Sequence, residues 1–236
     1  MNARSKQEKS LDQYAERVYS IGLDPYVQAL AKHKTDLVSN ILDVGCGAGQ
    51  WAIAAACLYP GAHVIGVDAD EYLLNFARAY ALRRDHSNCR FFAARLENLA
   101  ALFDERSFDL IMCNSVIQYV NEMRAFQIFS FLLRAKGVLL MFWNHAPGYY
   151  CSRLASELIR LNFRGAVYPL KVLVVTPFRP FLGMPSHDHF VTFGRLHQLA
   201  ARQGLTLTRI RSEPALDYQN GLWGIPKVFS CKGLRV

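Results

Sequence analysis

A glycine-rich segment at residues 45–49 constrains this chain more than any other feature. The apolar run 41–44, which contains Asp43, leads into glycines at alternate positions: Gly45, Gly47 and Gly49. Glycines at this spacing allow a backbone loop to lie flush against a bound nucleoside. The dinucleotide fingerprint G-x-G-x-x-G, counted from Gly45, requires a glycine where this chain has Gln50, so the segment disfavours that class of site.

Short apolar runs alternate with helix-period segments around and after this loop. The runs that predict strands are 39–44, 62–67, 89–93, 108–113 and 137–143. The helices predicted between them are 49–58, 70–84, 96–102 and 120–134. Two further helices are predicted before the first strand, at 7–20 and 25–34. This order is typical of parallel strands joined by right-handed crossovers, with helices on both faces of the sheet.

The regular alternation of predicted strands and helices ends after Trp143. The elements expected there are helices at 149–161 and 190–203 and strands at 205–211 and 227–231. Prolines and glycines before the last strand disfavour a crossover helix, so we expect that strand to be antiparallel. We therefore predict one α/β domain over residues 1–236, with a doubly wound, mostly parallel, seven-stranded Rossmann-like sheet and an N-terminal helical cover at 1–37.

An apolar insertion at about 162–187 has two interpretations. In one, it is a lid packed over the active site, and its prolines fix an irregular path. In the other, it dips into a membrane interface through Leu173, Val174, Val175, Phe178 and Phe181, with Lys171 and Arg179 beside them. We favour the lid because ligand pockets are lined mainly by apolar side chains.

The net charge of +8 lies entirely in the second part of the chain. Residues 145–236 hold 12 Lys/Arg and 4 Asp/Glu, whereas residues 1–144 are balanced. This distribution indicates an anionic partner for the second part: a phosphate-bearing or otherwise anionic small molecule, nucleic acid or a membrane surface. An ordinary basic surface that serves solubility is the alternative. The sequence leaves the oligomeric state open.

The six cysteines are scattered and include no C-x-x-C pair, which predicts reduced thiols in a cytoplasmic protein. The first nine residues are polar, unlike a signal peptide, and no run is long enough to span a bilayer. His187 and His189 share a face only in an extended segment, and no third ligand cluster accompanies them. We therefore predict no metal site, and we expect Asp188 to cap the helix at 190–203.

Ligands of open parallel sheets bind beyond the carboxyl ends of the strands. Asp68 ends the second predicted strand and follows Asp43 by 25 residues. A carboxylate at that position is suited to accept hydrogen bonds from both hydroxyls of a ribose. Asp68 could instead cap the following helix, but Asp70 is also placed to do so.

Over residues 38–144 the chain resembles the class I S-adenosylmethionine-dependent methyltransferases. Segment 43–49 matches the family's first motif, and 66–68 matches its second. Residues 108–111 with 114–119 are similar to the fourth-strand motif, and 136–140 to the turn and strand that follow.

The resemblance implies S-adenosylmethionine as cofactor, with a set of residues around it. It implies that the loop carrying Asp43, Gly45, Gly47 and Gly49 approaches the methionine moiety. Asp68 would hold the ribose hydroxyls, with Ala69 beside the adenine. The base edge would be flanked by Arg95 and Leu96, and the amino-acid portion approached by Asn114. Arg95 departs from the family, in which many members carry an acid at this position. Tyr14 and Arg17 would close over the cofactor from the N-terminal helix, or simply pack there.

A sulfonium methyl group is already activated, so the protein mainly has to align the acceptor and exclude water. A hydroxyl acceptor also requires a general base, and His145, just after the fifth strand, is the candidate. A structural or substrate-orienting role for His145 is the alternative.

We expect methyl transfer to oxygen on a small, sugar-linked or lipid-linked metabolite. Asn114-Ser115-Val116-Ile117 lacks the Asn/Asp-Pro-Pro-aromatic pattern of enzymes that methylate base amino groups. The first alternative is a tRNA- or RNA-modifying methyltransferase, which requires basic side chains on one face: Arg160, Arg164, Arg209 and Arg211. The second is a non-catalytic, cofactor-binding regulatory subunit.

Overall fold

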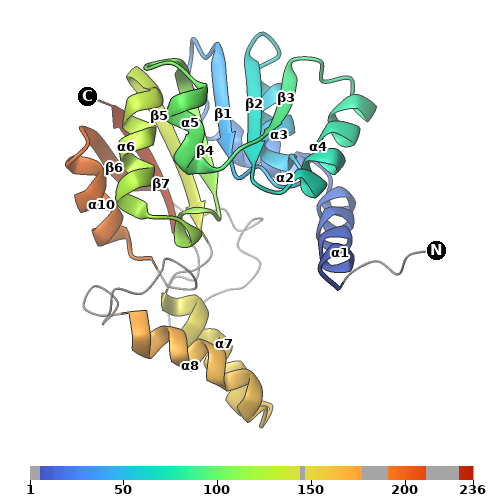
Figure 1. Cartoon of the computed structure of the whole chain (residues 1–236), viewed down its shortest axis with the longest axis vertical. Coiled ribbons are helices and arrows are strands. Elements are labelled where there is room, and N and C mark those ends of the chain that lie inside the picture. The colour runs from blue at the N-terminus through green and yellow to red at the C-terminus, as the bar shows by residue number, and fades with distance from the viewer. Residues whose placement is uncertain (1–5, 144–146, 177–190, 211–228, 236) are drawn as a thin grey trace.

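A computed structural model describes residues 6–143, 147–176, 191–210 and 229–235. Its centre is one seven-stranded sheet in the order β3-β2-β1-β4-β5-β7-β6 (Figure 1). The strands are β1 (Asn40–Val44), β2 (His63–Asp68), β3 (Cys89–Ala93), β4 (Phe108–Asn114), β5 (Leu133–Trp143), β6 (Leu205–Ile210) and β7 (Phe229–Arg235). The first five pair in parallel, as the strand–helix alternation predicts.

Helices cover both faces of the sheet. On one face, α2 (Asp24–Ala31), α3 (Gln50–Leu58) and α4 (Glu71–Arg83) share a core with Ile41 and Leu110. On the other, α5 (Leu99–Leu102), α6 (Glu122–Leu132) and α10 (Phe193–Ala201) pack with Leu42 and Ile111. Successive strand residues therefore point into two different cores, which is why the central strands are apolar throughout rather than alternating.

Two short 3-10 helices, η1 (Leu96–Asn98) and η2 (Ile117–Tyr119), follow β3 and β4. The N-terminal helix α1 (Lys6–Ile21) extends the α2–α4 side. There the ring of Tyr19 contacts the ring of Tyr80 on α4 in a tilted arrangement, with 4.4 Å between the ring centroids. The predicted helical cover at the N-terminus thus consists of α1 and α2.

The last strand confirms the predicted change of direction. β7 runs antiparallel to both β5 and β6 and lies between them. The chain therefore places β6 at the sheet edge first and then fills the gap with β7. The predicted start of this strand at 227 lies outside the described residues.

Helices α7 (Pro147–Ile159) and α8 (Phe163–Val175) form a hairpin that extends away from the sheet (Figure 1). The irregular path predicted for 166–175 is wrong, because this stretch is helical. Pro169 lies inside α8, and its buried side chain helps to form the face packed on α7. Packing of that face and the Asn162 cap, which accepts a hydrogen bond from Gly165 N at 3.1 Å, compensate for the amide that proline lacks. Residues 177–187 of the insertion lie outside the described part.

Among the described residues, no helix combines the length and the hydropathy that a membrane crossing requires.

Candidate functional site

The glycine loop joins β1 to α3 at the carboxyl end of the sheet. Gly45, Gly47 and Gly49 have φ values of 70°, 54° and 87°, which L side chains rarely adopt. A Cβ on Gly45 would overlap Cγ2 of Val116, and one on Gly49 would lie 2.8 Å from Cβ of Ala77. Glycine is therefore required here both by backbone conformation and by the close approach of neighbouring elements.

Backbone hydrogen bonds hold the loop against the end of β2. The amides of Gly45 and Cys46 both donate to the carbonyl of Val67, at 2.7 and 3.0 Å. The amide of Gly47 donates to Oδ2 of Asp68 at 2.8 Å. The loop and the acid at the end of β2 thus form one unit.

Asp68 occupies the position that the sequence predicts, and it does not cap α4. Its Oδ1 accepts a hydrogen bond from the amide of Asp70 at 2.9 Å. Asp70 is the cap, since its carboxylate accepts from the amide of Tyr72 at 2.9 Å. Each carboxylate oxygen has two acceptor positions, so Asp68 retains capacity for two further donors, such as a pair of ribose hydroxyls.

Several buried polar atoms at this end of the sheet have no hydrogen-bonding partner. They are both carboxylate oxygens of Asp43, both amide atoms of Asn114, Oε1 of Gln50 and Oε1 of Gln118. The strand register aligns Val44 with Cys113, so Asp43 and Asn114 stand close together on adjoining strands. Unpaired buried polar groups are costly and rare, and a cluster of them indicates a place where a polar ligand completes the bonding.

Burial, together with the nearby charge of Asp68, raises the pKa of Asp43 to about 8. The amide of Ala52 offsets part of this rise, although neither oxygen has a partner with normal hydrogen-bond geometry. The Asp43 carboxyl is therefore largely protonated at neutral pH in the protein alone. A cationic group bound beside it would favour the carboxylate.

Helix α1 contributes Tyr14 to the outer side of the loop. The hydroxyl of Tyr14 accepts a hydrogen bond from Nε2 of Gln50 at 2.9 Å and would lie 2.9 Å from a Cβ on Gly47. Burial raises the pKa of Tyr14, so it remains a neutral phenol. The guanidinium of Arg17 lies 5.7 Å from the Tyr14 ring centroid. Tyr14 and Arg17 are thus next to the loop, and their closure over a cofactor stays a prediction.

The remaining predicted residues are less closely grouped. Ala69 and Arg95 are exposed just beyond β2 and β3, at the same end of the sheet. Leu96 is buried in the core that also contains Leu99. His145, the predicted base, lies outside the described residues, as do His187 and His189.

The prediction that Asp188 caps the next helix is wrong. Helix α10 begins at Phe193, and the hydroxyl of Thr192 accepts a hydrogen bond from the amide of Arg195 at 3.4 Å. Helix α10 starts three residues after the predicted start at 190, so a different side chain is in place to cap it.

Sequence reasoning did not single out Gln118 and Gln50, each of which has a buried, unpaired Oε1. Gln118 is fully buried, and its Nε2 donates to the carbonyl of Ser115 at 2.7 Å, which leaves Oε1 unpaired. A glutamine directly after the apolar pair Val116-Ile117, at a strand end, was the signal available. Ser115 itself has a φ of 57°, so the backbone turns sharply after β4.

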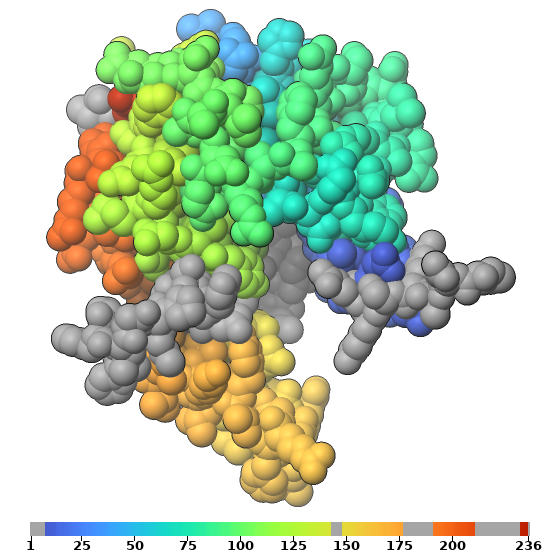
Figure 2. Space-filling view, viewed as in Figure 1, coloured from blue at the N-terminus to red at the C-terminus, as the bar shows by residue number. Residues whose placement is uncertain are grey.

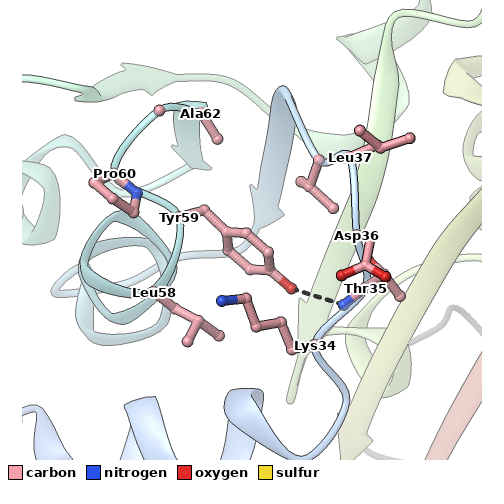
Figure 3. Close-up of a pocket in the computed structure, with 10 residues that line it drawn as sticks. Lys34, Thr35, Asp36, Leu37, Leu58, Tyr59, Pro60 and Ala62 are labelled. Carbon is pink, nitrogen blue, oxygen red and sulfur yellow. Dashed lines mark hydrogen bonds between the residues drawn. The ribbon is translucent and has the colours of Figure 1, made fainter.

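A separate groove of about 330 Å³ lies at the opposite, amino end of β1 and β2. Figure 3 shows Tyr59 at its centre, with its hydroxyl pointing toward Thr35, whose amide donates to it at 3.2 Å. Lys34 lies over the Tyr59 ring, 5.8 Å from its centroid. None of the described residues that line this groove has a buried polar atom without a partner, whereas such atoms gather at the other end of the sheet.

The geometry agrees with the comparison to known proteins. A model of the methyltransferase domain family matches residues 37–162, more than half of the chain and all of the loop-to-β4 region. The chain belongs to the methyltransferase domain family.

Two solved structures with the methyltransferase fold match most of this chain. The YcgJ protein of Bacillus subtilis superposes with a TM-score of 0.58 at 19% identity, over 89% of this chain and 96% of that one. An S-adenosylmethionine-dependent methyltransferase of Thermotoga maritima gives a TM-score of 0.60 at 16% identity, over 97% of each chain. These likenesses confirm the seven-stranded class I fold.

Curated relatives match over shorter stretches. The malonyl-[acyl-carrier protein] O-methyltransferase of Bacillus anthracis is 26% identical over 128 residues, which are 49% of this chain and 45% of that protein. The chain spans less than half of the length of the first curated relatives that it matches.

S-adenosylmethionine is the cofactor that the resemblance to class I methyltransferases implies, and the residues present fit it. The glycine loop is hydrogen-bonded to Asp68, Asp68 retains acceptor positions that suit ribose hydroxyls, and the unpaired polar atoms of Asp43 and Asn114 suit a charged amino-acid end. A ligand ammonium near Asp43 would lower the pKa that burial raises.

Proposed function

We propose that this protein transfers a methyl group from S-adenosylmethionine to an oxygen of a small, sugar-linked or lipid-linked metabolite, in the cytoplasm. The observation that supports S-adenosylmethionine as the methyl donor is the unit formed by the glycine loop and Asp68, with unpaired buried polar atoms around it. The scattered cysteines, which include no C-x-x-C pair, favour a reducing compartment.

The name of one relative supports oxygen as the acceptor atom, because it is a malonyl-[acyl-carrier protein] O-methyltransferase. A second relative, 31% identical over 81 residues, is an O-antigen chain terminator bifunctional methyltransferase/kinase of Escherichia coli, and its name does not state an acceptor atom. The basic second part of the chain favours an acceptor that carries a phosphate or carboxylate.

In this proposal the chain's own residues position the reactants. Bound S-adenosylmethionine supplies an activated sulfonium methyl group. Asp68 fixes the nucleoside end, while the glycine loop, Asp43 and Asn114 orient the amino-acid end, so that the acceptor oxygen can approach in line. We assign His145 to accept the proton of a hydroxyl acceptor, or to orient an acceptor that is already a carboxylate.

The RNA alternative requires a continuous basic face, and its residues come from separate elements. Arg160 and Arg164 belong to the α7–α8 hairpin, whereas Arg209 is on β6, where it lies 5.0 Å from the ring centroid of Phe193. Figure 1 places β6 at the sheet edge and the hairpin beyond its end. This separation favours a metabolite over a long nucleic-acid track.

Two measurements test the two parts of the proposal, the methyl donor and the methyl acceptor. Calorimetry with S-adenosylmethionine measures cofactor affinity, and a labelled-methyl transfer screen against cell extract, with and without ribonuclease, measures turnover. We expect binding, and labelled products that survive ribonuclease. Label lost on ribonuclease treatment would establish the RNA alternative, and binding without any transfer would establish a regulatory subunit.

A further inference from the structure

We propose that the α7–α8 hairpin docks this protein on an anionic lipid surface, through an apolar stripe that α8 turns to solvent. The stripe consists of Phe163, Val167, Leu170 and Val174. Their spacing of four, three and four residues places them along one side of the helix. Their exposed fractions lie between 50% and 66%.

The stripe is additional to the face that folds the hairpin. Ala166, Pro169 and Val172 are buried on another side of α8, where it packs on α7. The helix thus has its packing face already, and the exposed side chains are not needed to complete it. A helix with two apolar faces indicates a second surface that the stripe contacts.

Exposed apolar side chains continue around the turn of the hairpin. Leu158, Ile159 and Leu161 are 46%, 79% and 74% exposed. Of the 13 large apolar side chains that the described residues expose, the hairpin holds 7. The others are spread over the rest of the described surface, as is usual for single apolar residues, so this concentration is a specific feature of the hairpin.

Cations border the stripe. Arg160 in the turn and Arg164 and Lys171 on α8 are exposed, and none forms an ion pair within the part of the chain that the structure describes. Glu157 is the one acid between 147 and 176, and its Oε2 accepts a hydrogen bond from Nδ2 of Asn162 at 2.8 Å. The hairpin therefore presents a positive surface.

Apolar side chains bordered by unpaired cations match an anionic lipid surface both in charge and in hydrophobicity. Anionic headgroups attract the cations, and the acyl boundary beneath them accepts the apolar side chains. A nucleic acid would use the cations but leave the stripe in water. An apolar protein groove would use the stripe but not the charge. The combination favours a helix that lies on an anionic bilayer.

The arrangement of the hairpin leaves this surface accessible. Figure 2 shows the yellow-to-orange hairpin as a lobe that extends beyond the α/β body, with its far end clear of other coloured segments. Helix α7 begins at Pro147, shortly after β5 ends at Trp143. The hairpin is therefore attached at the carboxyl end of the parallel strands, where the glycine loop also lies. Docking through the hairpin would thus hold the cofactor site close to the lipid surface.

The test is a vesicle flotation assay with the purified full chain. We expect binding to vesicles of phosphatidylcholine mixed with phosphatidylglycerol, and little to phosphatidylcholine alone. The double variant Phe163→Ser/Val167→Ser should lower partitioning about tenfold or more, because the inserted apolar area is lost. Arg164→Glu should lower it about fivefold or more, with a smaller salt dependence.

Matched controls come from the body of the molecule. Leu82 on α4 is 84% exposed, and Arg90 on β3 is exposed, so Leu82→Ser and Arg90→Glu make the same chemical changes elsewhere. Both controls should bind vesicles like the unmodified protein. All four variants should keep their affinity for S-adenosylmethionine, which shows that they are folded.

Three results would overturn the proposal. The first is no preference of the unmodified protein for anionic vesicles. The second is an equal loss of binding in the controls, which would indicate a general charge effect. The third is a dimer, detected by sedimentation equilibrium, that Phe163→Ser/Val167→Ser dissociates, because the stripe would then be the contact between two copies.

Discussion

The carboxyl end of the sheet and the α7–α8 hairpin violate the usual distribution of polar and apolar groups in opposite ways. At the sheet, polar atoms of Asp43, Asn114 and Gln118 are buried without partners. On the hairpin, apolar side chains such as Ile159 and Phe163 face water. Each arrangement costs free energy in the protein alone and is compensated when a ligand of the matching chemistry binds. The difference teaches that the first region is built for a polar small molecule and the second for an apolar, anionic surface.

Gly45→Ala should have the largest effect on the sheet region. The new Cβ overlaps Cγ2 of Val116 at a φ of 70°, so we expect a loss of about 3 kcal/mol of stability and of measurable S-adenosylmethionine binding. Gly61→Ala is the matched control, since a Cβ there meets nothing within 4 Å. Thermal unfolding and calorimetry measure both. Unchanged S-adenosylmethionine binding by Gly45→Ala would show that the cofactor site does not require the observed conformation of the glycine loop.

Asp68→Ala should weaken S-adenosylmethionine binding by roughly 100-fold, because charged hydrogen bonds to the ribose and to the Gly47 amide are lost together. Calorimetry measures the affinity. Asp36→Ala, in the exposed groove at the other end of the sheet, serves as control and should change nothing. Full affinity in Asp68→Ala would remove the ribose assignment.

The buried Asp43 predicts a pH dependence of stability. Folding raises its pKa from 3.8 to about 8, so the native state binds this proton more tightly than the unfolded chain. The stabilisation is complete below pH 3.8 and is lost as the pH rises through about 8. The slope should be on the order of 1.4 kcal/mol per pH unit at most.

Asp43→Asn removes this titration while keeping the shape of the neutral carboxyl. Urea unfolding between pH 4 and 8 should therefore show a shallower loss of stability in the variant than in the unmodified protein. Identical slopes would mean that Asp43 is not the group responsible.

Asp70→Ala should cost about 1 kcal/mol of stability, because the amide of Tyr72 loses its cap. Its effect on cofactor affinity should be much smaller than that of Asp68→Ala, since only a backbone contact to Asp68 is disturbed. Comparing the two variants by thermal unfolding and calorimetry separates the capping role from the binding role.

The smallest effect on stability is expected on the hairpin. Leu170→Ser and Val174→Ser replace exposed side chains, so each should change stability by no more than about 0.5 kcal/mol. A large loss of stability would show that the stripe is part of the folded core. The hairpin would then no longer differ from the sheet region in the way proposed, because its apolar side chains would serve folding and not binding.

Much of this fold can be predicted from local patterns in the sequence. The apolar runs predict β1 to β4 to within one residue at each end, because strands buried on both faces must be apolar throughout. Asp70 was recognisable as a cap by its place before α4. By contrast, Pro169 indicated an irregular segment, and α8 formed around it because burial against α7 outweighs the missing amide.

The features of the candidate site also fall into those that the sequence predicts and those that only the structure reveals. The sequence by itself determined the glycine loop and the acid at the end of β2, since a positive φ restricts residue type and strand ends are marked by the pattern. Only the tertiary structure decided that β7 lies between β5 and β6, that Gln118 is buried with an unpaired oxygen, and that the hairpin turns its second apolar face to solvent. The physical reason is that conformational limits act on single residues, whereas burial and pairing depend on which distant segments pack together.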